Sequence, residues 1–163
     1  MMRVLTVANL MFTIVMLATA AKAEVPRELG YGSRAGMAVT VTSSHGIDTS
    51  NAVIVGRHTE KNARDFCVQY SLDRSQACVD KYLRELKLRS FITADCNRGT
   101  FTTFHGQNYM FVGKHNKVSD DIFMMVDYDI IDISKNEVLD GSSASGYPYV
   151  LGQFKALCPK RAR

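Results

Sequence analysis

The stretch Asp140-Gly141-Ser142-Ser143-Ala144-Ser145-Gly146-Tyr147-Pro148 joins a β-rich region to a segment with helical spacing that ends at Cys158. It is rich in serine and glycine, and it predicts a loop that presents backbone amides and hydroxyl groups in front of a helix. Such a loop suits contact with a polar partner, because small polar residues beside a tyrosine lose little conformational entropy on binding. We interpret the rest of the chain as the frame that holds this loop.

An ordinary connection explains the same residues equally well. In this interpretation a serine of the loop caps the final helix, and Gly146 provides a turn. The helix itself is predicted by Pro148 in its first turn. Its apolar face consists of Val150, Leu151, Phe154 and Leu157. The sequence leaves both interpretations of the loop open.

The N-terminus predicts export. A single arginine precedes an apolar run over residues 4–20, and Ala21-Lys22-Ala23 has the small-x-small pattern of a cleavage site. We therefore predict a signal peptide over residues 1–23 and a periplasmic location. A membrane anchor is the alternative, but Asn9 and Thr13 interrupt the apolar run. We expect membrane contact only through the cleaved signal peptide.

The cysteines of an exported chain predict two disulfides, because their number is even. They are Cys67, Cys78, Cys96 and Cys158. Cys67 lies about one turn before the end of a predicted helix and Cys78 about one turn after the start of the next, so antiparallel helices would bring them to the same height. Cys96–Cys158 follows by elimination, and it would tie the C-terminal segment to the sheet.

The pattern of apolar residues predicts an α+β fold. Residues 24–36 are glycine-rich and without periodicity, so we expect a flexible lead-in to a single domain over residues 37–163. That domain should contain an antiparallel, partly rolled sheet of about six or seven strands. A disulfide-stapled helical hairpin on one side and a short C-terminal helix complete the expected architecture.

Period-two alternation predicts most of the strands. The candidate strands cover residues 37–43, 52–58, 91–96, 100–104, 109–113, 122–133 and 137–139. Between the second and third strands, two amphipathic helical patterns form the hairpin. Thr59 can cap the first helix, and Asp73 or Ser75 can cap the second. The alternation in residues 122–133 shifts after Ile130, which suggests a bulge.

No catalytic signature is present, so we expect no catalytic residue. The four histidines are dispersed through turns and strand ends, and a catalytic histidine needs an oriented nucleophile or carboxylate. An alternative is a small hydrolase that pairs a histidine with Asp95 or Asp127. The sequence contains no Gly-x-Ser-x-Gly motif and no dinucleotide fingerprint in a strand-to-helix context.

Composition also argues against several classes of ligand. Neither a Cys-x-x-Cys motif nor zinc-ligand spacing of histidines is present, and the aspartates around Asp129 match no calcium loop, so we expect no metal and no cofactor. The formal net charge is +4, with scattered basic residues. A nucleic-acid-binding protein usually carries a denser basic stripe with interleaved aromatic residues, so no nucleic-acid partner is predicted.

The run Ser143-Ala144-Ser145-Gly146-Tyr147-Pro148-Tyr149 resembles the serine–glycine–tyrosine loop of bacterial periplasmic inhibitors of C-type lysozyme. In those inhibitors the loop enters the lysozyme cleft, and its serine meets the catalytic carboxylates. The chain is also similar to a family of small exported alphaproteobacterial proteins with the same Asp-Gly-Ser-Ser-Ala-Ser-Gly-Tyr and Leu-Cys-Pro stretches. It departs from the compact β-barrel of the classical inhibitors by its predicted helical hairpin.

These patterns lead to the hypothesis of a periplasmic binding protein that inhibits lysozyme-like peptidoglycan hydrolases by loop occlusion. The proposed contact residues are Ser143, Ser145, Gly146 and Tyr147, with Arg98 or Lys114 as partners for acidic groups. The expected partner is a protein, a peptidoglycan hydrolase in the sharpest form of the hypothesis. A structural or interaction module of the cell envelope is the main alternative.

Overall fold

The computed structural model describes residues 24–115 and 126–163. The predicted signal peptide over residues 1–23 lies outside the described residues, and so do the first four residues of the strand predicted over 122–133. The described part forms an antiparallel sheet of eight strands with three helices and two disulfides. This architecture confirms the predicted α+β class.

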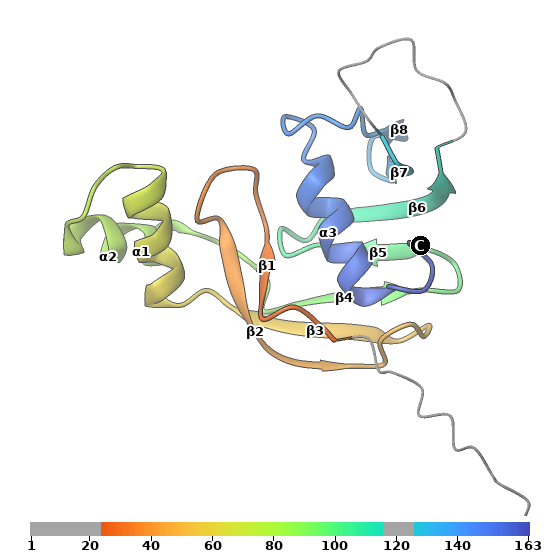
Figure 1. The fold of residues 1–163 in the computed structure, drawn as a ribbon, viewed down its shortest axis with the longest axis horizontal. Coiled ribbons are helices and arrows are strands. Elements are labelled where there is room, and N and C mark those ends of the chain that lie inside the picture. Colours follow the sequence, from red (N-terminus) through yellow and green to blue (C-terminus); the bar gives the residue numbers. More distant parts are fainter. Residues whose placement is uncertain (1–23, 116–125) are drawn as a thin grey trace, which may run out of the picture.

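The strands of the sheet lie side by side in the order of the sequence (Figure 1). They are β1 Glu28–Gly30, β2 Ala38–His45, β3 Ala52–Arg57, β4 Phe91–Asp95, β5 Thr100–Thr102, β6 Asn108–Lys114, β7 Tyr128–Asp132 and β8 Glu137–Val138. Each strand pairs antiparallel with the next, and β2–β3 and β6–β7 each contain a register shift. The edge strands β1 and β8 are the shortest along with β5, which limits the unpaired backbone exposed at the edges.

Residues 24–36 contain β1, so the prediction of a flexible lead-in was wrong for this segment. β1 pairs with β2, and its Leu29 is 5% exposed. Tyr31, immediately after the strand, is fully buried, and Gln153 donates a hydrogen bond to the Gly30 carbonyl (2.8 Å). A three-residue strand is too short to show alternation, so its partners in space rather than its own pattern place it in the sheet.

The helix α3 (Tyr147–Leu157) lies against one face of the sheet and closes the main core (Figure 1). Phe154 stacks on Phe111 with ring centroids 4.3 Å apart, and it also contacts Phe101 at 4.9 Å. Val150 and Leu157 are fully buried beside them. Burial of each such side chain stabilises a fold by roughly 1.5–3 kcal/mol, so this contact is the main hydrophobic contribution of the C-terminal segment.

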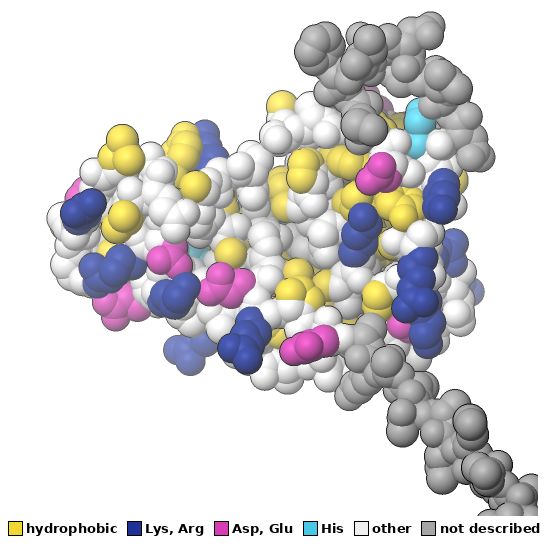
Figure 2. All heavy atoms as spheres, in the orientation of Figure 1, with side chains coloured by type: hydrophobic (Ala, Val, Ile, Leu, Met, Phe, Trp, Pro, Cys, Tyr) yellow, Lys and Arg dark blue, Asp and Glu magenta, His cyan; other side chains and the backbone are white. Residues whose placement is uncertain are grey.

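The helices α1 (Glu60–Gln69) and α2 (Gln76–Glu85) form a hairpin that extends from the end of the sheet (Figure 1). Thr59 caps α1, as predicted, and Asn62 completes a capping box. Ser75 caps α2, whereas the competing candidate Asp73 accepts a hydrogen bond from the Ser75 amide (2.7 Å). Figure 2 shows acidic and basic side chains interspersed over this hairpin.

The hairpin has a small core of its own. Ala63, Phe66, Cys67 and Val79 are buried there, and Tyr82 stacks on Phe66 with centroids 3.9 Å apart. Both predicted disulfides are present. Cys67–Cys78 joins the two helices with a Cα–Cα distance of 6.1 Å, and Cys96–Cys158 joins the end of β4 to the end of α3 at 5.5 Å.

The two disulfides should act on different parts of the fold. On the chain-entropy model, the short loop contributes about 3 kcal/mol and the long one about 4 kcal/mol to the free energy of unfolding. We expect the double variant Cys67→Ser/Cys78→Ser to accelerate amide hydrogen exchange mainly in α1 and α2. The variant Cys96→Ser/Cys158→Ser should accelerate exchange across the sheet and α3. Equal exchange profiles in the two variants would contradict this division.

Candidate functional site: the serine loop and its acidic pocket

The serine loop, residues 140–146, connects β8 to α3 and is held by its own hydrogen bonds. The Ser142 amide donates to the Asp140 carboxylate (2.9 Å), and the Ser145 amide donates to Ser142 Oγ (3.1 Å). The Ser145 hydroxyl donates to the Ser142 carbonyl (2.9 Å). Hydrogen bonds from Ser142 also lower the pKa of Asp140, so its carboxylate is charged at neutral pH. The loop is therefore a preformed turn rather than a free segment.

Gly146 ends the loop in the left-handed region at φ 84° and takes the N-cap position of α3. No side chain caps this helix, so the alternative in which a serine provides the cap is wrong. A Cβ at Gly146 would overlap the Tyr149 hydroxyl. Glycine is required here by both the backbone conformation and the space.

The exposed part of the loop is smaller than the sequence predicts. Ser143 and Ala144 are exposed, Ser145 is half-buried, and Gly146 and Tyr147 are buried. The partner-contact role predicted for Tyr147 is wrong, because this side chain is only 5% exposed. Tyr147 therefore belongs to the protein's own core. Gly146 is buried and serves the backbone turn at the start of α3 rather than a contact with a partner.

Tyr147 anchors the loop to the sheet. Its hydroxyl donates to the Tyr128 carbonyl (3.0 Å) and accepts from the Tyr128 amide (3.0 Å). Tyr128 begins β7, so a single phenol satisfies both backbone groups of that residue. Burial raises the pKa of Tyr147, which keeps the phenol protonated and able to donate.

The two predicted cations do not both accompany the loop. Arg98 lies in the turn between β4 and β5, next to the Cys96–Cys158 bridge at the far end of α3. An α-helix of eleven residues is about 16 Å long, so this arginine is remote from the serines. Lys114 ends β6 opposite Tyr128 and is exposed, so it lies on the loop's side of the sheet.

A polar pocket of about 310 Å³ opens beside the loop, and no sequence pattern predicted it. It is lined by Gln107, Tyr109, Asp132, Lys135, Glu137, Val138, Leu139, Asp140, Ala144, Ser145 and Tyr149. These residues come from five separate segments that meet where β8 ends. Three of the lining side chains are acids and one is a lysine, so the pocket favours a cationic group.

Two buried groups define the floor of this acidic pocket. Asp132 is 3% exposed and accepts hydrogen bonds from the Ser134 hydroxyl (2.6 Å) and amide (2.9 Å). These bonds, the hydroxyl first, lower the pKa of Asp132 against the opposing effect of burial. Burial, with the neighbouring Tyr149 and Asp132, raises the pKa of Tyr109 to about 12. The floor thus pairs a charged carboxylate with a protonated phenol.

The histidines do not form the predicted pairs with Asp95 or Asp127. His115, the residue after β6, instead has its Nδ1 2.6 Å from the carboxylate of Asp129 on β7, whose register partner is Gly113. Such a pair can orient an imidazole, but none of the described serine, threonine or cysteine side chains bonds to it. Within residues 24–115 and 126–163, no group of three or more metal-ligating side chains is placed to hold an ion.

Comparison with known proteins adds no relative. No protein-family model matches the chain, and no match was found among curated proteins or solved structures. None of the helices in the described part has the length and apolar character required to span a bilayer. The functional argument therefore depends on the loop, its pocket and the surfaces of the sheet.

Removal of the Tyr147 hydroxyl should loosen the loop. The variant Tyr147→Phe leaves two buried backbone groups of Tyr128 without a partner, which costs about 1–3 kcal/mol. We expect a matching drop in the free energy of unfolding and faster amide exchange in residues 140–146. Tyr149→Phe is the control, because its half-buried hydroxyl does not serve the Tyr128 backbone. Unchanged exchange in Tyr147→Phe would show that the anchor does not hold the loop.

The Asp132 carboxylate should stabilise the fold in a pH-dependent way. Because its folded-state pKa is lowered from 3.8, the stabilisation is present above this value and is lost as the pH falls through the folded-state pKa. Asp132→Asn should therefore reduce the free energy of unfolding by about 1–2 kcal/mol at pH 7. Denaturant titrations of the unaltered protein and of Asp132→Asn, at pH 7 and near pH 2, would measure the difference in their free energies of unfolding. A difference that persists in acid would contradict the assignment to the charged carboxylate.

Proposed function

We propose that this protein is an exported binding protein of the periplasm and that its serine loop contacts a protein partner. The observation that carries this proposal is the construction of the loop. Ser143 and Ala144 are exposed at its tip, while Tyr147 fixes its base in the core. A loop that is already ordered loses little conformational entropy on binding, so most of its contact energy becomes affinity.

Two features support the location in an oxidising compartment. All four cysteines are paired in disulfides of ordinary geometry, which form and persist outside the cytosol. The N-terminal sequence predicts the signal peptide that would deliver the chain there. We propose the periplasm as that compartment.

The proposed partner is a lysozyme-like peptidoglycan hydrolase, and the resemblance of the serine loop supports this class. The structure changes the expected mode of contact. Of the predicted contact residues, Ser143 is exposed at the tip whereas Tyr147 is buried, and Arg98 is too remote to accompany the loop. The acidic pocket instead places Glu137 and Asp140 beside the loop, where they can pair with basic side chains at the rim of a partner's cleft.

This arrangement assigns separate tasks to the loop and the pocket. Occlusion of a cleft depends on the shape of the exposed tip. Charge pairs at the rim chiefly affect the rate of association and the choice of partner. A structural envelope module is the second candidate, supported by exposed apolar side chains at Val112 (53%) and Val138 (56%).

A lysis assay tests the proposal. Purified protein should slow the clearing of cell-wall suspensions by a C-type lysozyme or by endogenous muralytic enzymes. Ser143→Trp should reduce this inhibition at least tenfold, because a bulky side chain on the exposed tip blocks insertion without disturbing the core. Ser44→Trp, on the exposed part of β2, is the matched control.

Two results would refute this function. One is the absence of inhibition by the unaltered protein against every muralytic enzyme tested. The other is equal inhibition by the Ser143→Trp variant and the control. Amide exchange of residues 140–146 in both variants would show whether the loop has kept its conformation.

A further inference from the structure

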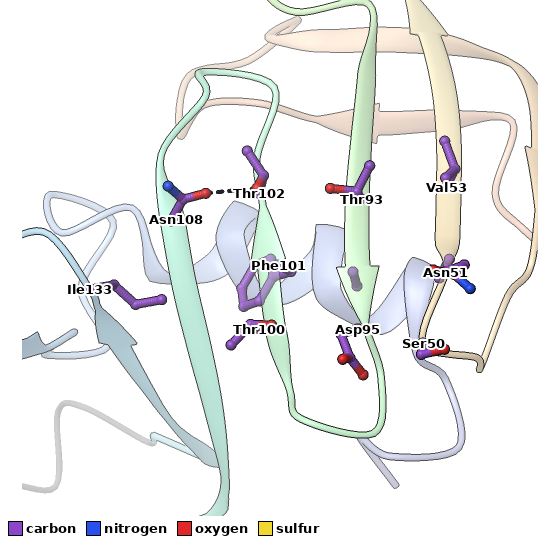
Figure 3. Close-up of a pocket in the computed structure, with 12 residues that line it drawn as sticks. Ser50, Asn51, Val53, Thr93, Asp95, Thr100, Phe101, Thr102, Asn108 and Ile133 are labelled. Carbon is purple, nitrogen blue, oxygen red and sulfur yellow. Dashed lines mark hydrogen bonds between the residues drawn. The ribbon is translucent and has the colours of Figure 1, made fainter.

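A second surface lies on the face of the sheet opposite α3. A shallow groove of about 500 Å³ runs across the middle strands there (Figure 3). It is lined by Ser50, Asn51, Ala52, Val53, Thr93, Ala94, Asp95, Thr100, Phe101, Thr102, Asn108 and Ile133. The lining residues come from the turn before β3, from β3 to β6 and from the residue after β7, so the groove runs across the strands rather than along them.

The register of the sheet places hydroxyl and amide groups in a row along this groove. Thr93 on β4 is the cross-strand neighbour of Val53 on β3 and of Thr102 on β5. Thr102 in turn pairs with Asn108 on β6, and the Ile133 amide bonds to the Asn108 carbonyl. Strands β3 to β6 and the residue after β7 therefore each contribute one residue to the row, in the order apolar, polar, polar, polar, apolar.

The polar side chains of this row are positioned relative to one another. The Thr102 hydroxyl donates to the Asn108 side-chain oxygen (2.7 Å), so the amide nitrogen of Asn108 is directed away from Thr102 (Figure 3). Thr93 and Thr102 are half-buried β-branched residues with restricted rotamers. The row thus presents hydrogen-bonding groups that are already ordered, which lowers the cost of binding.

The groove contains almost no charge. Asp95 is the single charged side chain among the described residues that line it. Its carboxylate accepts hydrogen bonds from the Asn97 and Arg98 amides and lies 3.7 Å from the Arg98 guanidinium. A surface without a lining cation is unsuited to a polyanion such as nucleic acid or an acidic polysaccharide. The ligand that fits is extended, rich in hydroxyl or amide groups, and uncharged.

We propose that this groove binds an uncharged β-1,4-linked polysaccharide strand, with N-acetylglucosamine units as the best-matched sugar. Neighbouring strands of a sheet are about 4.8 Å apart, and each sugar of an extended β-1,4-linked chain advances it by a similar distance. One sugar therefore lies over each strand of the row. Hydroxyl groups of successive sugars, with the acetamido group of every second sugar, then face Thr93, Thr102 and Asn108.

The apolar ends of the row complete this match. The C–H faces of a pyranose ring are apolar, and Val53 and Ile133 present aliphatic surface at either end of the threonines. Ile133 is 48% exposed, so its aliphatic surface is accessible to a ligand. Because the serine loop adjoins α3 on the other side of the sheet, a bound polysaccharide would leave the loop accessible. This inference goes beyond the proposed function and does not depend on it.

Titration with chitin oligosaccharides tests the proposal. Addition of N,N′,N″,N‴-tetraacetylchitotetraose to the ¹⁵N-labelled protein should shift the amide signals of residues 93–95, 100–102 and 108. The double variant Thr93→Val/Thr102→Val keeps the β-branched shape but loses two hydroxyl groups, and it should bind about tenfold more weakly. Thr42→Val, on the exposed part of β2, is the matched control and should bind as the unaltered protein does.

Each alternative outcome overturns the assignment. No shifts at millimolar tetrasaccharide would exclude a sugar site, and shifts confined to other residues would place it elsewhere. Equal affinity of the double variant would show that the threonine row does not make the contact. Melting curves of all variants establish that the fold is intact. The serine loop is unaltered in these variants. A negative result in the sugar titration would therefore refute the groove proposal without refuting the function tested by the lysis assay.

Discussion

The contact between α3 and the sheet is the constraint on which the rest of the structure depends. Phe154 of α3 stacks on Phe111 of β6, and the Cys96–Cys158 bridge fixes the end of the same helix to the end of β4. A helix attached by packing along its length and by a covalent bond at one end has little freedom to slide. The position of its first residue is thereby determined, and this residue is Tyr147.

The serine loop gains its order from that determined position. Once the start of α3 is fixed, Tyr147 reaches the Tyr128 backbone and holds the base of the loop against β7. The loop spans the short distance between β8 and the helix, so its serines bond to each other and to Asp140. The exposed tip is therefore shaped by contacts that lie entirely within the fold, and a partner need not induce its conformation.

Local patterns predicted the parts of the fold that local forces determine. Thr59 and Ser75 cap their helices through hydrogen bonds that span three residues. The Cys67–Cys78 pair follows from those two helices alone, since an antiparallel hairpin brings equivalent turns together. Contacts between distant segments were predicted less well. β1 is too short to show a period, and it is placed by its pairing with β2, the burial of Tyr31 and the Gln153 hydrogen bond to the Gly30 carbonyl.

The candidate site was predicted incompletely for the same reason. The sequence predicted an exposed turn around Ser143, because serine and glycine favour such turns, and Ser143 and Ala144 are exposed. Tyr147 was misassigned because the sequence around a tyrosine beside a loop does not show whether its side chain faces solvent or the core. The acidic pocket combines Tyr109, Asp132 and Asp140, which only the pairing of β6, β7 and β8 brings together. No spacing along the chain carries that information.

The helical hairpin meets the body of the protein at an aromatic junction of Tyr31, His58 and Tyr82. The Tyr31 hydroxyl lies 2.9 Å from that of Tyr82 on α2, and the His58 ring contacts both tyrosines edge-on. Burial raises the pKa of each phenol and lowers the pKa of His58. Tyr31 belongs to the main core that α3 closes, whereas Tyr82 packs against the small core of the hairpin, so this pair of phenols joins the two cores. The serine loop thus depends on the contact between α3 and the sheet, whereas the hairpin is held by its own core, its disulfide and this pair of phenols.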